Sequence, residues 1–236
     1  MKNCRGNIMC VRRAVLLFSI AFLLFAPVCR AQDQRIVREP IEWLDVWLPN
    51  SDASDLPRVL LIGDSITRAY YPKVADLLKG KAYVGRLATS KCVGDPLLVE
   101  QVKLVLSESH FDVIHFNNGM HGWGYTEIEY RDHFPDFFAA IQAGAPDAKL
   151  IWASTTPVRE ANHVDQFSDR TDRVRQRNEI AADVLTAHEI GFDDLFSLVL
   201  NHPEYYKPDG VHFDDAGVEA EAEQVADKIL QVLPSH

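Results

Sequence analysis

The chain of 236 residues has only four cysteines, and three of them, Cys4, Cys10 and Cys29, fall within the N-terminal stretch 1–31. Only Cys92 remains in the rest of the chain, which excludes an internal disulfide there. Roughly 205 residues bury enough apolar surface to be stable without such a cross-link. No motif surrounds Cys92, so we expect a small packing residue rather than a nucleophile.

Basic residues are also scarce after this N-terminal stretch. The stretch itself holds five of the 24 basic residues and no acidic ones, which leaves 19 basic against 34 acidic residues and a formal net charge of −15. Nucleic-acid phosphates require a basic footprint, so the charge balance excludes nucleic acid as a partner. It also argues against anionic membrane surfaces, whereas neutral ligands such as acetylated sugars remain compatible.

Long apolar runs are confined to the N-terminus, where residues 14–28 form one stretch. Basic residues precede this stretch, and the small residue Ala31 follows it. An apolar core of roughly 15 residues with such flanks is typical of a secretory signal peptide rather than of a spanning helix. We therefore predict a signal peptide at residues 1–31, a secreted or periplasmic protein, and no stable membrane insertion of the mature chain. An uncleaved N-terminal membrane anchor is the alternative.

The sequence also lacks internal repeats, low-complexity linkers and metal-binding clusters. No histidine or carboxylate pair has the helical spacing of a zinc site with a third partner, so we expect no metal and no other cofactor. The remaining chain is economically interpreted as an irregular lead-in at residues 32–57, followed by one domain at residues 58–236.

From Arg58 onward, short apolar runs alternate with longer segments of helical periodicity. We expect strands at residues 58–63, 82–87, 112–118, 148–154 and 191–196, and helices near 66–79, 97–109, 126–143, 170–189 and 215–232. This alternation predicts an α/β fold, in which βα repeats build a parallel, about five-stranded sheet. Right-handed crossovers then place helices on both faces of the sheet.

The segment Gly63-Asp64-Ser65-Ile66-Thr67 joins the first predicted strand to the first predicted helix. A serine at such a turn projects its hydroxyl above the carboxyl edge of the sheet, where open α/β sheets bind ligands. The helix N-terminus beneath it supplies free backbone N–H groups and a positive dipole end, which suit an oxyanion. The other interpretation of this segment is that Asp64 or Ser65 is a simple helix cap.

A possible partner for Ser65 comes near the C-terminus, in Lys207-Pro208-Asp209-Gly210-Val211-His212-Phe213. Proline and glycine predict a loop here, directly before the last helix. A serine nucleophile needs a base to take its proton, and the base needs a carboxylate to orient it. A turn would direct the Asp209 carboxylate to one nitrogen of His212 and leave the other for Ser65. A surface turn with an incidental histidine is the alternative.

Together, Gly63-Asp64-Ser65 after the first strand and Asp209-x-x-His212 before the last helix make the chain resemble the GDSL, or SGNH, hydrolase superfamily. The resemblance covers the chain from about Arg58 to its end. It implies a flavodoxin-like three-layer α/β/α sandwich and ester hydrolysis without a metal. It also implies Ser65 as nucleophile, His212 as general base and Asp209 as the residue that orients it.

Two further positions concern the oxyanion hole that the resemblance implies. Gly94 matches the glycine whose backbone N–H the family uses, beside that of Ser65. The family also has Gly-x-Asn after the third strand, and aligning Gly119 with that glycine puts His121 in the place of the asparagine. An imidazole N–H also donates hydrogen bonds, so His121 is our candidate for the side-chain donor.

The departure at His121 leaves alternatives open. Asn118 or Asn117 would supply the donor if the loop were shifted, and otherwise the hole would be incomplete. Trp123 and Asn118 are our candidates for contact with the substrate. The leading hypothesis is a serine esterase that acts on a small-molecule or polysaccharide ester, with O-acetyl groups on carbohydrate as the favoured substrate. A non-catalytic carbohydrate-binding module and an acyltransferase with the same triad are the competing hypotheses.

Overall fold

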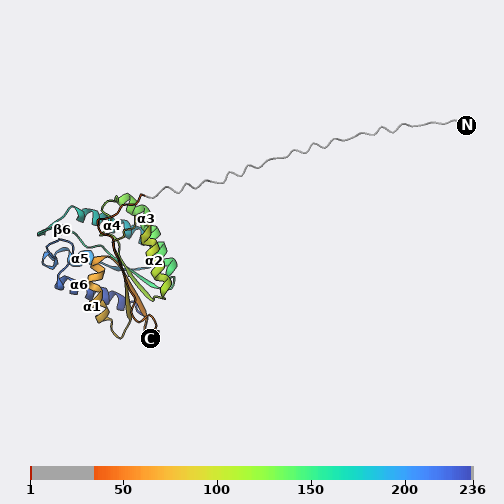
Figure 1. Ribbon diagram of the computed structural model, residues 1–236, viewed down its shortest axis with the longest axis horizontal. Helices are drawn as coiled ribbons and strands as arrows, with labels where there is room; N and C mark the ends of the chain where they lie inside the picture. Colours follow the sequence, from red (N-terminus) through yellow and green to blue (C-terminus); the bar gives the residue numbers. More distant parts are fainter. Residues whose placement is uncertain (2–34, 235–236) are drawn as a thin grey trace. The chain divides into compact units, whose positions relative to one another are not determined.

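Five apolar runs of the sequence form the parallel strands of a central sheet in the computed structural model of the protein (Figure 1). They are β2 (Arg58–Gly63), β3 (Tyr83–Thr89), β4 (Val113–Phe116), β5 (Lys149–Ala153) and β8 (Gly191–Asp193). Each strand starts at its predicted start or at the next position along the chain. The predicted α/β class and parallel sheet are therefore confirmed.

The structure describes residue 1 and residues 35–234. The predicted signal peptide at residues 1–31 thus lies, apart from Met1, outside the described residues. Within the described part of the chain, no helix is both long enough and apolar enough to cross a membrane.

A sixth strand, β1 (Leu44–Trp47), comes from the segment predicted to be an irregular lead-in, and that description is wrong for these residues. β1 pairs antiparallel with β3 at the edge of the sheet. Its partner strand follows in the chain only after β2 and the first helix, so no local turn signal marks the pairing. We call residues 36–47 the N-terminal strap, because this segment also crosses the loops at the carboxyl edge of the sheet, as described below.

The strand order is β1-β3-β2-β4-β5-β8. Among the five parallel strands, the first in sequence lies between the second and the third, which is the flavodoxin-like order. The chain leaves β2 toward β3 on one side and later returns to β4 on the other side. Ligands of open α/β sheets bind at such a switch point, outside the carboxyl ends of the strands. The loops after β2 and β4 flank this position.

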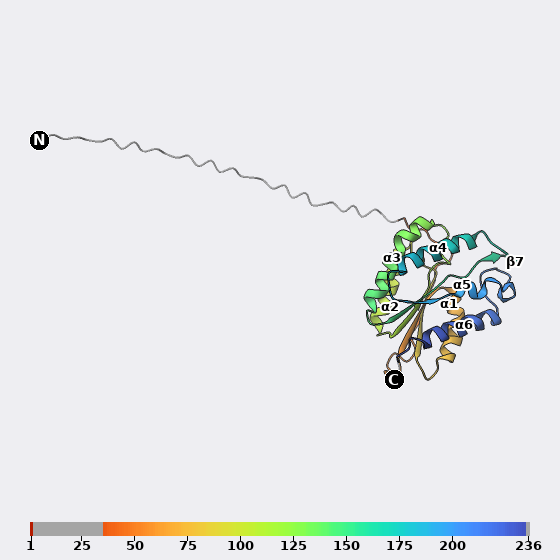
Figure 2. The ribbon, with the colours of Figure 1, turned by 180° about the vertical axis from the view of Figure 1, so that it is seen from behind.

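Helices cover both faces of the sheet, which confirms the predicted three-layer arrangement (Figures 1 and 2). One face carries α1 (Ser65–Leu77), α5 (Leu195–Leu200) and α6 (Asp215–Leu230). The other carries α2 (Pro96–Glu108), α3 (Glu127–Gly144) and α4 (Arg170–Leu185). The sequence did not predict α5, the hairpin of β6 (Arg159–Glu160) and β7 (His163–Phe167), or the 3₁₀ turn η1 (Pro203–Tyr205).

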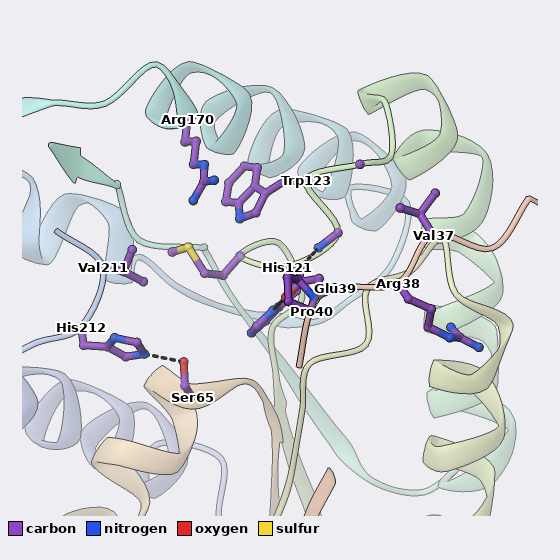
Figure 3. Close-up of a pocket in the computed structure, with 13 residues that line it drawn as sticks. Val37, Arg38, Glu39, Pro40, Ser65, His121, Trp123, Arg170, Val211 and His212 are labelled. Carbon is purple, nitrogen blue, oxygen red and sulfur yellow. Dashed lines mark hydrogen bonds and ion pairs between the residues drawn. The ribbon is translucent and has the colours of Figure 1, made fainter. Parts of the chain in front are cut away.

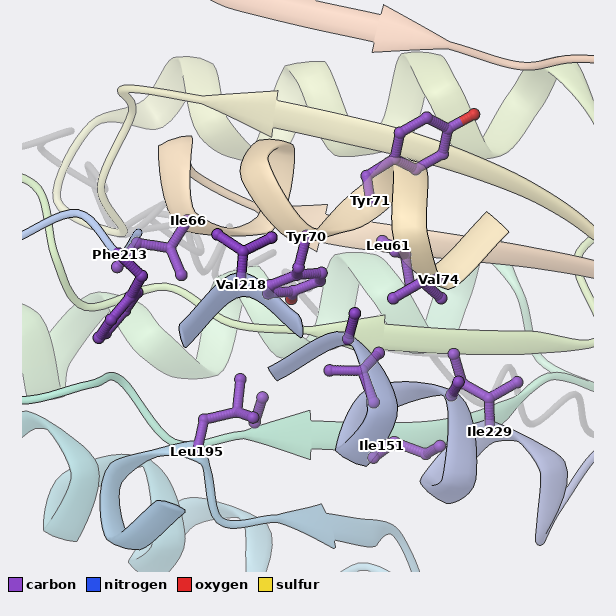
Figure 4. Close-up of a cluster of buried hydrophobic side chains, with 14 of the residues drawn as sticks. Leu61, Ile66, Tyr70, Tyr71, Val74, Ile151, Leu195, Phe213, Val218 and Ile229 are labelled. Carbon is purple, nitrogen blue, oxygen red and sulfur yellow. The ribbon is translucent and has the colours of Figure 1, made fainter. Parts of the chain in front are cut away.

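The two cores follow from the alternation of side chains along β2. Val59 and Leu61 point into the cluster beneath α1 and α6, shown in Figure 4, whereas Leu60 and Ile62 point into the cluster beneath α2 and α3. All four side chains are at most 1% exposed. A central strand covered on both faces must be apolar at every position, which explains why this run is continuous rather than alternating.

A buried polar group lies within the layer between the sheet and α6. His115, whose side chain is fully buried, has its Nε2 atom 2.9 Å from Asp193 Oδ2, and Gln224 donates to Asp193 Oδ1. Glu221 of α6 is also fully buried, and neither carboxylate oxygen has a hydrogen-bond partner among the described residues. Burial, together with the charges of Asp64 and Asp193, raises the pKa of Glu221 well above its ordinary value.

We predict that Glu221→Gln stabilises the protein at neutral pH. The unfolded chain loses the Glu221 proton near the ordinary carboxyl pKa, whereas the folded chain holds it to higher pH, so stability falls as pH rises between the two values. Each pH unit within this window costs about 1.4 kcal/mol. Urea unfolding should show no gain for Glu221→Gln near pH 4 and a growing gain toward pH 7.

The control is Glu223→Gln, which removes an exposed carboxylate from the same helix. It should leave the free energy of unfolding nearly unchanged at both pH values. A Glu221→Gln protein that is equally destabilised at every pH would contradict the prediction.

Candidate active site

Ser65 is the first residue of α1 and lies at the carboxyl end of β2. Asp64 caps the helix, because its Oδ1 accepts the Ile66 N–H at 2.9 Å. Gly63 is required by close packing, since a Cβ atom there would lie 2.0 Å from Thr67 Oγ1. The Ser65 N–H has no acceptor within its own helix, as in the first turn of any α-helix. A helix cap at Asp64 and a half-buried serine hydroxyl at Ser65 are thus both features of this turn.

Ser65 and the C-terminal loop meet as the spacing predicted (Figure 3). The Ser65 Oγ and His212 Nε2 atoms are 2.8 Å apart, and His212 Nδ1 lies 2.9 Å from Asp209 Oδ2. The other oxygen of Asp209 accepts the backbone N–H groups of Val211 and His212 at 2.9 and 2.8 Å. A hydroxyl, an imidazole and a carboxylate are therefore joined in one hydrogen-bonded chain.

The electrostatics of Asp209 favour its charged form. Partial burial alone would raise its pKa, but the two backbone N–H bonds and the bond to the His212 ring outweigh burial and lower it. The loop geometry is fixed by Gly210, which has a φ of +74° and accepts the Arg159 N–H at 2.7 Å. A Cβ at Gly210 would lie 2.2 Å from the Arg159 carbonyl oxygen, so only glycine fits.

A cavity of about 460 Å³ opens beside Ser65 and His212. The N-terminal strap forms one wall with residues that include Glu39 and Pro40, and the loop after β4 forms another with residues that include His121 and Trp123. The strap is tied down by side chains, because Arg38 pairs with Asp95. Several elements distant in the sequence thus converge on one cavity.

The His121 ring lies on the other side of Ser65 from His212 (Figure 3). Its Nδ1 atom is 2.8 Å from Glu39 Oε2, and the second oxygen of Glu39 accepts the Gly122 N–H at 2.8 Å. Its Nε2 atom is buried and has no hydrogen-bond partner among the described residues. Burial alone would lower the pKa of His121, but the bond to Glu39 and the nearby charge of Asp64 raise it above its ordinary value.

Arg177 of α4 fixes the loop that carries His121. Its guanidinium is 1% exposed and donates to the carbonyl oxygens of Gly119, His121 and Gly122, at 2.8, 2.7 and 3.2 Å. Gly122 has a φ of +76°, and a Cβ there would lie 2.2 Å from Cys92 Sγ. With its carbonyl groups held by α4, this loop has little freedom to move.

Trp123 lines the cavity, as its predicted contact with substrate requires. Its ring lies beneath the guanidinium groups of Arg170 and Arg177, with centroid distances of 4.9 and 4.7 Å. Arg170 also lines the cavity. This wall therefore combines an aromatic face with positive charge.

Three predicted site residues do not line the cavity: Asp209, which reaches the site through His212, and Gly94 and Asn118. Gly94 packs against the Tyr125 ring, with 2.7 Å between an added Cβ and Tyr125 Cδ1, and its N–H faces the Cys92 thiol. Asn118 accepts the Val93 N–H at 3.1 Å and donates to the Lys91 carbonyl at 2.8 Å, so its amide holds the loop after β3 rather than facing a ligand.

The alternative donor, Asn117, is likewise occupied elsewhere, because its amide donates to Ala153 O and Thr155 Oγ1.

Cys92 is buried, and its burial raises the pKa of the thiol to about 11, as suits a packing residue. Across residues 35–234, no group of three histidine, cysteine or carboxylate side chains is arranged to hold a metal ion.

Three residues of the site were missed at the sequence level: Glu39, Arg170 and Arg177. Glu39 lies in a segment without a motif, 82 residues before the histidine that it contacts. The two arginines lie in a helix with several other charged residues, where a buried arginine looks like a solvated one. The apolar spacing around Arg177, with Val174, Ile180 and Ala181 on the buried face, was the one available signal.

No protein-family model matches the sequence, and a search of curated proteins finds no match either. Solved structures do match the fold. A GDSL-like lipase from Bacteroides thetaiotaomicron is 17% identical, with a TM-score of 0.56 and coverage of 75% of this chain and 89% of that one. A carbohydrate esterase family 3 protein from Talaromyces cellulolyticus is 16% identical, with a TM-score of 0.58 and coverage of 75% and 97%.

The aryl esterase of M. smegmatis is 13% identical, with a TM-score of 0.60 and coverage of 75% of this chain and 100% of that one. The chain therefore has the fold of GDSL-like lipases and esterases, as the two sequence motifs implied.

We predict that Arg177→Met destabilises the protein by about 3 kcal/mol, because three buried carbonyl groups lose their donor and each unsatisfied group costs about 1–3 kcal/mol. Methionine keeps most of the buried volume, so the loss reports hydrogen bonding rather than a cavity. Chemical denaturation monitored by circular dichroism measures it.

Arg175→Met is the matched control, since Arg175 is an exposed arginine of the same helix. It should cost less than about 1 kcal/mol. Equal effects of the two substitutions would contradict the role assigned to Arg177.

Proposed function

We propose that this chain, which shares the fold of GDSL-like lipases and esterases, is an exported serine ester hydrolase with Ser65, His212 and Asp209 as its catalytic triad. The observation that carries the proposal is the hydrogen-bonded chain of 2.8 and 2.9 Å from Ser65 Oγ through His212 to Asp209, at the wall of a cavity. A serine that only caps a helix does not require a histidine beside its hydroxyl. A histidine that lies incidentally in a surface turn does not require a serine beside its ring.

In the first half of the reaction, Ser65 Oγ attacks the ester carbonyl carbon while His212 Nε2 takes the hydroxyl proton. Asp209 accepts a hydrogen bond from Nδ1–H of His212 and stabilises the imidazolium that forms. Collapse of the tetrahedral intermediate breaks the bond to the leaving alcohol, to which His212 returns the proton. A water molecule, activated by His212, then attacks the acyl-enzyme and releases the carboxylic acid.

The tetrahedral intermediate carries a negative oxygen that needs hydrogen-bond donors. The Ser65 N–H at the start of α1 and the His121 ring are the donors that we propose. His121 lines the same cavity and has a buried Nε2 without a partner among the described residues, which supports a ligand atom as its missing acceptor. Gly94 does not line the cavity and is not part of this proposal.

We favour short acyl esters as substrates, in particular O-acetyl groups on carbohydrate. Trp123 and Arg170 give one wall an aromatic side chain and a cation, which suit a polar sugar ester, and the cavity of about 460 Å³ is of the size that holds a small ligand. The similar structures include a carbohydrate esterase, and an exported enzyme would meet polysaccharides outside the cell. These observations support a small-molecule or polysaccharide ester as the substrate.

Ser65→Ala should lower kcat/KM for 4-nitrophenyl acetate by about 10³-fold or more, since the nucleophile is lost while the fold remains. Thermal unfolding of the variant should match that of the unchanged protein. Ser197→Ala, at an exposed serine of α5, is the control and should keep full activity. A correctly folded protein without activity on a broad ester panel would instead favour a non-catalytic carbohydrate-binding module.

Product analysis with an acetylated oligosaccharide separates hydrolysis from acyl transfer. We expect free acetate as the product, even with excess unacetylated sugar present, and a fall in rate as the acyl chain lengthens from acetyl to octanoyl. Accumulation of a newly acetylated sugar at the expense of free acetate would favour the acyltransferase hypothesis.

A further inference from the structure

Two carboxylate–imidazole pairs face the same cavity from opposite sides of Ser65. One is the Asp209–His212 pair of the proposed triad, and the other is the Glu39–His121 pair, which links the N-terminal strap to the loop after β4. Both have an Nδ1–carboxylate distance of 2.8–2.9 Å. Only His212 has its Nε2 on the Ser65 hydroxyl, whereas Nε2 of His121 is buried without a partner among the described residues.

The contacts of Glu39 determine which proton positions His121 can adopt. Because Oε2 of Glu39 is an acceptor, Nδ1 of His121 must carry a proton. A neutral ring protonated at Nδ1 has a lone pair at Nε2 and cannot donate from that atom. His121 therefore donates from Nε2 only as the doubly protonated imidazolium.

Glu39 also fixes the orientation of the ring. Its second oxygen accepts the Gly122 N–H, so the carboxylate bridges the side chain of one residue and the backbone of the next. On the far side of this loop, Arg177 holds the carbonyl groups of His121 and Gly122. The loop is thus clamped between a carboxylate of the strap and a guanidinium of α4.

We propose that Glu39 is a positioning residue of the active site, which holds the His121 ring as a charged donor with Nε2 directed to the oxyanion formed at Ser65. This inference rests on the proposed ester hydrolysis and adds a residue of the strap to it. A charged donor stabilises a developing oxyanion more strongly than a neutral one.

The charged groups around His121 agree with this role. Burial of the ring opposes its charge, but the carboxylates of Glu39, Asp64 and Glu42 act together to raise the pKa of His121. The same pairing, with the Gly122 N–H, lowers the pKa of Glu39 despite its burial. The cations around the site include Arg177, which binds the loop carbonyl groups, and Arg38 and Arg170 on the cavity wall. Arg68 lies over the Trp43 ring, which packs edge-on against His121.

The two histidines then have opposite requirements. His212 must be neutral to take the Ser65 proton, whereas His121 must be protonated to donate to the oxyanion. The rate should therefore fall at high pH, as His121 loses its proton. Glu39 raises the pKa of His121 and so extends activity to higher pH.

Glu39→Gln tests the proposal through the pH profile of kcat/KM. The variant removes the charge that favours the imidazolium, so the alkaline limb should move down by about one pH unit or more. At pH 8 the variant should then lose about tenfold more activity than it loses at pH 6. A loss by the same factor at every pH would show a merely structural role and overturn the proposal.

The matched control is Asp45→Asn, which removes another carboxylate of the strap. Asp45 pairs with Arg86 of β3 at 2.9 Å and does not contact His121, so its loss loosens the strap alone. The alkaline limb of this variant should stay in place. A limb that moves as far as in Glu39→Gln would assign the effect to anchoring of the strap.

A variant of His121 tests whether Glu39 acts through the His121 ring or elsewhere. In His121→Asn, the amide donates without needing a proton, so the alkaline limb assigned to His121 should disappear. Adding Glu39→Gln to this background should leave the shape of the profile unchanged. A further shift in the double variant would place the action of Glu39 elsewhere and overturn the proposal.

Histidine NMR provides a readout that does not depend on catalysis. In the Ser65→Ala protein, the ring of His121 should titrate at a higher pH than in the same protein with Glu39→Gln. An unchanged titration would overturn the proposal for Glu39 even if the esterase is active. If the Ser65→Ala protein were instead active, the proposed function would be wrong. The titration of His121 would still test its pairing with Glu39.

Discussion

The reversal of direction at β2 is the constraint on which the site depends. The chain crosses from β2 over one face to β3, then over the opposite face to β4, and right-handed crossovers permit no other placement of α1 and α2. The carboxyl ends of β2 and β4 consequently lie side by side with no helix between them. The loop after β2 brings Ser65 to this gap, the loop after β4 brings His121, and α6, on the same face as α1, places the preceding loop with His212 opposite them.

A buried arginine is costly unless its donors are satisfied, and here it organises the loop beside the gap. Arg177 donates hydrogen bonds to three backbone carbonyl oxygens, so the carbonyl groups of Gly119, His121 and Gly122 point toward α4. The opposite side of the loop then presents the Gly122 N–H and the His121 ring to the strap, where Glu39 accepts from both. A cation on one side and an anion on the other thus hold a short, glycine-rich loop in one conformation.

The parts of the structure that were predictable are those with local signals. Apolar runs marked the parallel strands, and Gly63-Asp64-Ser65 and Asp209-x-x-His212 each carried enough chemistry in a few residues to suggest a shared site. The strap had no such signal, since β1 pairs with a strand that follows only after β2 and α1, and Glu39 meets a histidine 82 residues away. Gly94 and Asn118 failed as cavity residues for a related reason. Both follow a strand at the expected place in the sequence. In the fold, however, the Tyr125 ring packs against Gly94, and the Asn118 amide is hydrogen-bonded to the backbone of the loop after β3.

The strap also affects how the site is assembled when the chain folds. The contacts that assemble it join residues far apart, 147 positions for Ser65 and His212 and 82 for Glu39 and His121. Contacts of such high sequence separation require a long loop to close, and this closure costs conformational entropy. A chain shortened to begin at Arg58 would keep Ser65, His212 and every parallel strand, yet would lack Glu39, the carboxylate that contacts the His121 ring. The arrangement around Ser65 is therefore not a property of its pentapeptide alone: it requires the loop with His212 from one end of the domain and the strap from the other.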